Sequence, residues 1–130
     1  MGVPWRTLSG CKMHSHNLID EAAGVARMRY ITDTPGQQAV YLLKRDEALA
    51  LQASPASTPG PHIAAEAVVL GLSVQQVVAS IVAQNAHWTG VLSPAIESAR
   101  MGGKAAVRSA ADVPGVLAAL DAALVVLNGL

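Results

Sequence analysis

The chain has 130 residues, which is enough for one domain and too few for two of ordinary size. Nine Lys and Arg residues balance nine Asp and Glu residues, so the basic excess typical of nucleic-acid or anionic-membrane binding is absent. Apolar residues make up 52%, charged residues 14% and aromatic residues only 3%, so small apolar side chains must build the core. Because a neutral chain with few charges is prone to associate, we expect a helical protein that forms homo-oligomers and binds no nucleic acid.

Cys11 is the one cysteine, so an internal disulfide is excluded. The N-terminal segment lacks the apolar stretch of a signal peptide. The longest apolar run, residues 116–127, is shorter than the ~20 residues of a membrane span and contains Asp121. We therefore expect no membrane span, and a protein that either stays in the cytoplasm or is assembled there and leaves inside a larger particle.

Residues 1–17 show no helical period and are expected to form an extended arm. Asn17 is a suitable N-cap for a first helix, because Asp20 and Glu21 then lie in its first turn, where the helix dipole favours acidic groups. We expect this helix to end near Ile31.

A helix-start signal follows at Thr34, Pro35 and Gln37, which supply a cap, a first-position proline and the glutamine of a capping box. The second helix that they predict ends near Ala53. We expect the two helices, residues 18–53, to pair as a hairpin.

Residues 54–61 contain three prolines and one glycine, a composition that prevents helix formation and predicts an extended linker. The rest of the chain, residues 62–130, is expected to be a helical half that packs with the hairpin into one compact unit. It begins with a short apolar helix over residues 63–70, closed by Gly71.

The longest predicted helix covers residues 73–101 and starts at a capping box made by Ser73 and Gln76. Ser93–Pro94 is expected to kink or restart it, and the glycines at 102 and 103 to end it. Its residues recur at alternating steps of four and three, as in a coiled-coil seam with one polar residue. From this seam we assign to an interface Val74, Val78, Ile81, Asn85, Trp88 and Leu92.

Asp112 is the predicted N-cap of a last, short helix. The leucines of this helix also step by four and three, and those that we assign to the interface are Leu117, Leu120 and Leu124. The predicted fold is therefore all-α: a helical hairpin, a Pro-rich joint, a long helix with a seam and a short C-terminal helix.

Cys11, His14 and His16 are residue types that bind zinc, and they lie close together in the sequence. A fourth ligand is missing nearby, so we prefer to interpret them as an incidental cluster. A small metal-binding protein or metal-dependent enzyme is the alternative that they leave open. No nucleophile lies beside a base in a recognisable motif, and we expect neither enzymatic activity nor a cofactor.

The segment from Arg27 to Ala48 combines a cationic pair, two tyrosines and the helix-start signal. It resembles small helical proteins of tailed bacteriophages and prophages that are encoded among tail and tail-fibre genes. The resemblance resumes at Ile96–Glu97, Arg100 and residues 102–107. The residues that carry it in the first segment are Arg27, Arg29, Tyr30, Pro35, Gly36, Gln37, Tyr41 and Lys44.

The resemblance implies a structural or adaptor component of a phage tail, near the fibre or baseplate, whose partners are other tail or fibre proteins. It implies assembly in the host cytoplasm and a final place in the virion. A tail or fibre assembly chaperone that does not remain in the virion is the alternative. The resemblance implies no catalytic residues.

Overall fold

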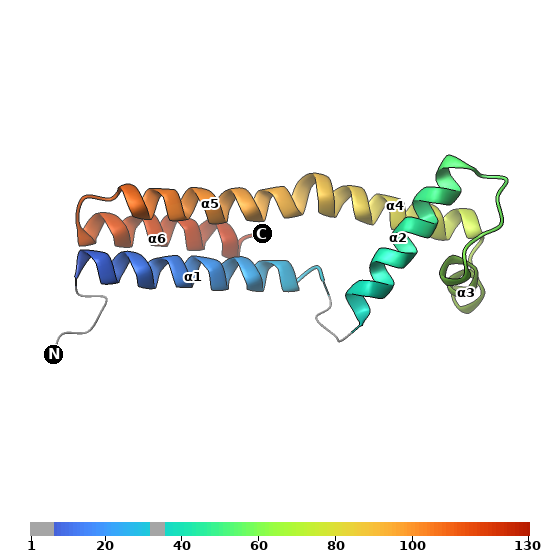
Figure 1. The fold of residues 1–130 in the computed structure, drawn as a ribbon, viewed down its shortest axis with the longest axis horizontal. Coiled ribbons are helices and arrows are strands. Elements are labelled where there is room, and N and C mark those ends of the chain that lie inside the picture. Colours follow the sequence, from blue (N-terminus) through green and yellow to red (C-terminus); the bar gives the residue numbers. More distant parts are fainter. Residues whose placement is uncertain (1–6, 32–35) are drawn as a thin grey trace. The chain divides into compact units, whose positions relative to one another are not determined.

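The computed structural model describes residues 7–31 and 36–130. Every regular element in these ranges is a helix, which confirms the all-α prediction (Figure 1). The chain forms two compact units rather than the single one predicted. The first unit combines the segment that ends at Tyr30 with Leu92–Leu130, and the second unit is Ile31–Val91.

Helix α1 spans Leu8–Met28 and begins earlier than predicted, because Thr7 is its N-cap and accepts a hydrogen bond from the Gly10 N–H at 2.9 Å. The extended arm is therefore wrong for residues 8–17, while residues 1–6 lie outside the described part of the chain. Asn17 is an exposed position inside the helix. The buried face of α1 contains small and polar side chains that hid its period in the sequence; it consists of Cys11, Ser15, Ile19, Ala23 and Ala26.

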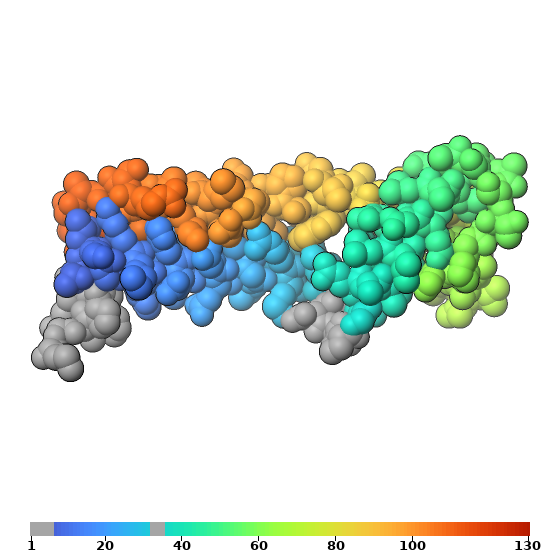
Figure 2. Space-filling model, viewed as in Figure 1, coloured from blue at the N-terminus to red at the C-terminus, as the bar shows by residue number. Residues whose placement is uncertain are grey.

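The first unit packs α1 against α5 (Ser93–Ser109) and α6 (Val113–Asn128), which also pack against each other. Figure 2 shows the side chains of α1 and α5 in contact along this unit. Asp112 caps α6 as predicted, accepting a hydrogen bond from the Gly115 N–H at 2.8 Å. The largest side chains fully buried in this unit are Ile19, Ile96, Val107, Val116 and Leu127.

Gly103 brings the helices of the first unit close together. A Cβ atom at this position would lie 2.6 Å from the Cβ atom of Ala123 and 3.4 Å from Cδ1 of Ile19. The absence of a side chain therefore allows α5 to approach both α6 and α1. The prediction that the glycines at 102 and 103 end the helix is wrong, because this packing stabilises α5 as far as Ser109.

The second unit consists of α2 (Gln37–Ala53), α3 (Pro61–Leu70) and α4 (Val74–His87), which all contact one another. The chain leaves the helix at Ser54, as the Pro-rich linker predicts, but it re-enters a helix at Pro61, two residues before the predicted start at Ile63. The predicted closure of α3 by Gly71 is also confirmed, with a φ of 66°. The buried core of the second unit is formed by Ala48, Ile63, Ala67, Val77 and Ile81.

The predicted hairpin of residues 18–53 is wrong, because α1 packs in the first unit and α2 in the second. Helix α1 packs against α5 and α6, and α2 packs against α3 and α4. Thr34 and Pro35 of the predicted helix start lie outside the described residues, and α2 begins at Gln37, after Gly36 with a φ of 80°.

The long predicted helix begins at the expected capping box and is interrupted by a π-helical turn, Trp88–Leu92, that separates α4 from α5. Pro94 follows this turn. Because proline has no N–H and its ring collides with the carbonyl group four residues earlier, a wider turn before it relieves the clash. Thr89 Oγ1 also donates a hydrogen bond to the Asn85 carbonyl at 2.7 Å.

Within the described ranges, no single helix combines the length and the apolarity of a membrane span. One pair of helices joined at a sharp bend, 61–70 with 74–109, meets both criteria together.

Candidate functional site

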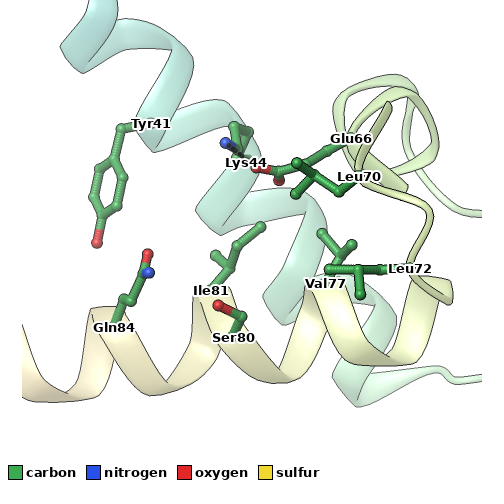
Figure 3. Close-up of a pocket in the computed structure, with 9 residues that line it drawn as sticks. All are labelled: Tyr41, Lys44, Glu66, Leu70, Leu72, Val77, Ser80, Ile81 and Gln84. Carbon is green, nitrogen blue, oxygen red and sulfur yellow. Dashed lines mark hydrogen bonds and ion pairs between the residues drawn. The ribbon is translucent and has the colours of Figure 1, made fainter. Parts of the chain in front are cut away.

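The candidate site is a cavity of about 90 Å³ between α2, α3 and α4 of the second unit (Figure 3). Apolar side chains from α3, α4 and the corner between them form one part of its wall, and polar side chains from all three helices form the rest. Its lining consists of Tyr41, Lys44, Glu66, Leu70, Leu72, Val77, Ser80, Ile81 and Gln84.

The charges of this cavity are internally balanced. Lys44 Nζ donates a hydrogen bond to Glu66 Oε1 at 2.9 Å, and both side chains are about a quarter exposed. The second carboxylate oxygen, Glu66 Oε2, is buried and has no hydrogen-bond partner among the described residues. The wall of the cavity therefore contains a lysine and a glutamate that are already paired with each other.

Two of these polar residues, Tyr41 and Lys44, belong to the distinctive segment of the sequence, whereas Glu66, Ser80 and Gln84 belong to no motif. Glu66 lies in an otherwise apolar helix, which was the one signal that could have drawn attention to it. Ser80 and Gln84 lie four residues apart and therefore on one face of α4. Only the packing of α2 and α3 shows that this face lines a cavity.

Beside the cavity, Glu47 of α2 binds the first turn of α3. Its Oε1 atom accepts hydrogen bonds from the backbone N–H groups of His62 at 2.9 Å and Ile63 at 3.2 Å. Burial raises the pKa of Glu47, but the hydrogen bonds from the His62 ring and from these two N–H groups outweigh it, and the pKa is lowered overall. Glu47 is thus a charged cap of α3.

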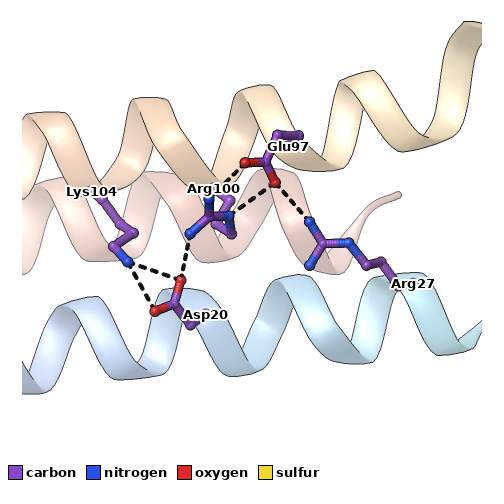
Figure 4. A network of polar contacts seen from close by, with 5 residues as sticks. All are labelled: Asp20, Arg27, Glu97, Arg100 and Lys104. Carbon is purple, nitrogen blue, oxygen red and sulfur yellow. Dashed lines mark hydrogen bonds and ion pairs between the residues drawn. The ribbon is translucent and has the colours of Figure 1, made fainter.

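The first unit carries a network of charged side chains between α1 and α5 (Figure 4). Asp20 accepts hydrogen bonds from Lys104 Nζ at 2.9 Å and from Arg100 Nη1 at 3.0 Å. Arg100 also binds Glu97 at 2.6 Å, and Glu97 binds Arg27 at 2.7 Å. This chain of ion pairs connects the two helices over several turns.

The charged groups of this network shift the pKa values of three of its members, Asp20, Glu97 and Arg100. The hydrogen bond from Lys104 lowers the pKa of Asp20, with a further contribution from Arg100. The hydrogen bond from Arg100 lowers the pKa of Glu97, and the carboxylates of Glu97 and Asp20 raise the pKa of Arg100. Asp20, Glu97 and Arg100 are thereby stabilised in their charged forms at neutral pH, as in a structural network rather than a proton-transfer site.

Comparison of the chain with protein-family models, with curated proteins and with solved structures gives no match. What can be inferred about its function therefore comes from the arrangement of its own residues.

The residues that carry the phage resemblance are divided between the two units. Arg27 belongs to the charged network, and Arg29 Nη1 donates hydrogen bonds to the carbonyl groups of Leu127 and Leu130, both at 3.1 Å, at the end of α6. Tyr30 is about half exposed. In the second unit, Tyr41 and Lys44 line the cavity, Gly36 and Gln37 are exposed at the start of α2, and Pro35 lies outside the described residues.

The first part of the predicted seam packs within the second unit. Ile81 is buried in the core of this unit, and Val74 and Val78 are partly buried and pack against that core. Asn85, Trp88 and Leu92 are only partly buried. The side chain of Asn85 has its Oδ1 atom buried without a hydrogen-bond partner among the described residues.

On α6 the buried face is shifted by one residue from the predicted one. Val116, Ala123 and Leu127 are buried, whereas Leu117 is 52% exposed. Leu120 and Leu124 lie at the edge of this face and are partly buried. Leu117, Val125 and Val126 are instead exposed on the solvent side of α6, where Asp121 lies between Leu117 and Val125, and we call this side the outer α6 face.

Cys11, His14 and His16 lie on α1 with different orientations. Cys11 is buried in the first unit, His14 is exposed and His16 is partly buried. Among the described residues, no three His, Cys, Asp or Glu side chains form a group that could hold a metal ion.

Proposed function

We propose that this chain is a structural or adaptor component of a bacteriophage tail that acts through contacts between helices. The outer α6 face is the observation that supports this proposal best. Its valines, Val125 and Val126, are 66% and 51% exposed, and Leu117 is 52% exposed. Large apolar side chains that are exposed on one helix are a feature of interaction surfaces.

The outer α6 face is well suited to a second copy of the same chain. The whole chain has a net charge of zero, so two copies do not repel each other at long range. Asp121, the only charged residue of α6, is exposed between Leu117 and Val125 on this face. Ala118 and Ala122, which are also exposed, permit close approach of a second helix. Homo-oligomerisation through α6 is therefore part of the proposal.

The assignment to a phage tail depends on the resemblance at Arg27, Arg29, Tyr30, Tyr41 and Lys44. Several of these residues hold helices together: Arg27 binds α5, Arg29 binds α6, and Lys44 binds α3.

Light scattering at micromolar concentration tests the contact. We expect a dimer or larger oligomer, and a shift to monomer in Val125→Lys. Val25→Lys, which changes a valine of α1 that is 55% exposed, is the matched control and should leave the oligomer intact. A wild-type monomer that also fails to bind co-expressed tail or fibre proteins would exclude the proposal.

Mass spectrometry of purified virions from cells that produce the chain tests its place in the tail. A structural component remains at a fixed number of copies per particle. An assembly chaperone, the alternative function, is present in the infected cell and absent from the particle.

A further inference from the structure

The place where the chain turns from α3 into α4 is both apolar and strongly exposed (Figure 1). Val68 and Val69 are each 82% exposed, Leu70 is 57% exposed and Leu72 is 41% exposed. We call these four side chains the α3–α4 corner. Single exposed apolar side chains are ordinary on a protein surface, but a group of them within five residues indicates a surface that binds something.

Helix α3 directs its ionisable groups toward its own unit. His62 and Glu66, the two that it contains, both pair with side chains of α2. Its exposed residues are all apolar, namely Pro61, Ala65, Val68, Val69 and Leu70. A helix on the surface of a globular protein normally has the opposite pattern, and a helix that is apolar all round is typical of a protein core or a membrane.

The chain that follows α3 is also uncharged. After Glu66, the next Asp, Glu, Lys or Arg in the sequence is Glu97, so neither the α3–α4 corner nor α4 contains one. Helix α3 together with the helices after it reaches the length and apolarity of a membrane span, but with a bend of 109°. Shallow insertion of the corner is compatible with this bend.

The backbone at the corner is already hydrogen-bonded within the protein. The N–H groups of Gly71 and Leu72 donate to carbonyl groups of α3, at 3.3 and 3.0 Å. The Ser73 N–H donates to Gln76 Oε1 at 2.9 Å. A backbone N–H without an acceptor is costly in hydrocarbon, and these bonds allow the corner to leave water without that cost.

The corner is too small for a stable protein interface of its own. A standard interface buries about 800 Å² and about 20–30 residues on each partner, whereas the corner has four side chains. Successive residues of a helix also point about 100° apart, so one rigid partner cannot cover all of residues 68–70. Fluid lipid chains can surround them and require no minimum area.

We propose that the α3–α4 corner inserts into the surface of a lipid bilayer, with Val68 and Val69 among the acyl chains. The corner has no basic side chain, so the lipid that it fits is zwitterionic, such as phosphatidylcholine, and binding depends on apolar contact rather than on charge. The corner lies in the second unit and the outer α6 face in the first, so this proposal is independent of the proposed assembly role.

Flotation of the full chain with phosphatidylcholine vesicles tests the proposal. A single myristoyl chain binds bilayers with a constant of about 10⁴ M⁻¹, and we expect the corner to bind about tenfold more weakly, with half of the protein bound at about 1 mM lipid. Adding about 30% phosphatidylserine or about 0.5 M salt should change binding less than about threefold. No flotation at about 10 mM phosphatidylcholine, or binding that requires phosphatidylserine, would overturn the proposal.

Two matched variants locate the contact. Val69→Asp places a charge in the corner and should weaken vesicle binding at least about tenfold. Val25→Asp makes the same change at a valine of α1 that is 55% exposed and should leave binding unchanged. Circular dichroism verifies that both variants fold, and Val68→Asp replaces Val69→Asp if that variant does not.

Equal flotation of a folded corner variant and the wild type would contradict the site. A corner variant that changes the oligomeric state without lipid, in a chain whose wild type does not float, would assign the corner to a protein contact and overturn the lipid proposal.

Discussion

Glu47 of α2 and His62 of α3 are bound to each other through two pairs of atoms. Glu47 Oε2 lies 2.5 Å from His62 Nδ1, and Glu47 Oε1 accepts the hydrogen bond of the His62 backbone N–H at 2.9 Å. The N-cap position of α3 is Gly60, which has no side chain to cap the helix. A carboxylate from a preceding helix therefore satisfies the first N–H groups of α3, and its charge complements the helix dipole.

Replacing Glu47 by Ala should destabilise the second unit. The change leaves two N–H groups at the start of α3 without their acceptor, and we expect a loss of about 1–2 kcal/mol in the free energy of unfolding. Asp46→Ala, at the adjacent exposed position, should cost less than about 0.5 kcal/mol. Urea denaturation followed by circular dichroism measures both. Equal effects of the two substitutions would show that the cap contributes nothing.

Asp20 should make the stability of the first unit depend on acid pH. Its pKa is lowered in the folded state by the hydrogen bond from Lys104, so its ion pairs stabilise the fold above the unfolded-state pKa of about 4. That contribution is lost as the pH falls through the lower, folded-state pKa. At pH 7 we expect Asp20→Asn to cost at most about 1 kcal/mol, because the side chain is 44% exposed.

The difference in stability between Asp20→Asn and the wild type should disappear below the folded-state pKa, where the wild-type carboxyl is protonated, and should shrink in high salt. Glu21→Gln, at the next and exposed position of α1, is the control and should show no such dependence. Thermal melts at several pH values provide the measurement. A difference that persists unchanged at the lowest pH would refute the electrostatic explanation.

Gly103→Ala and Gly102→Ala should have opposite effects. A Cβ atom at Gly103 would lie 2.6 Å from the Cβ of Ala123, so this change should destabilise the first unit by about 1–3 kcal/mol. At Gly102 nothing lies within 4 Å of the added atom, and alanine should stabilise the helix by about 0.5–1 kcal/mol. Chemical denaturation of the two variants tests the close approach of α5 and α6; equal stabilisation would contradict it.

Ile96→Ala should be more destabilising than Trp88→Ala. Ile96 is fully buried in the first unit, and its truncation should cost about 2–5 kcal/mol. Trp88 lies in the π-helical turn, which contains no buried residue, so we expect its truncation to cost less than about 2 kcal/mol. Melting temperatures rank the two variants. The reverse order would restore Trp88 as the main anchor of the seam.

Asn85→Leu should raise the melting temperature of the protein. The Asn85 Oδ1 atom is buried without a hydrogen-bond partner in the described structure, and an unsatisfied polar atom costs about 1–3 kcal/mol. Leucine fills a similar volume and removes that atom. Differential scanning calorimetry would detect the change, and sizing of the same sample would show whether Asn85 also restricts the oligomeric state. A lower melting temperature would mean that the amide has a role in the folded state.

Local signals in the sequence predicted the ends of several helices correctly. The capping box of Ser73 and Gln76, the cap at Asp112, the closing glycine at position 71 and the Pro-rich linker are all found in the structure. Each depends on a hydrogen bond or a backbone angle within a few residues. Of the polar residues of the candidate site, only Tyr41 and Lys44 were singled out, because they belong to a distinctive segment. Glu66, Ser80 and Gln84 were missed because no motif connects them.

By itself, the sequence determined that this protein is helical, where α4 and α6 begin and where α3 ends. The tertiary structure decided which helices pack together: α1 joins α5 and α6, although α2 is its neighbour in sequence. It also decided which face of α6 is buried, with Val116 inside and Leu117 outside. On an apolar helix with one charge, leucine, valine and alanine occur on every side. Local chemistry then cannot distinguish the faces, and only the shape of the partner helices, including the gap at Gly103, selects the one that is buried.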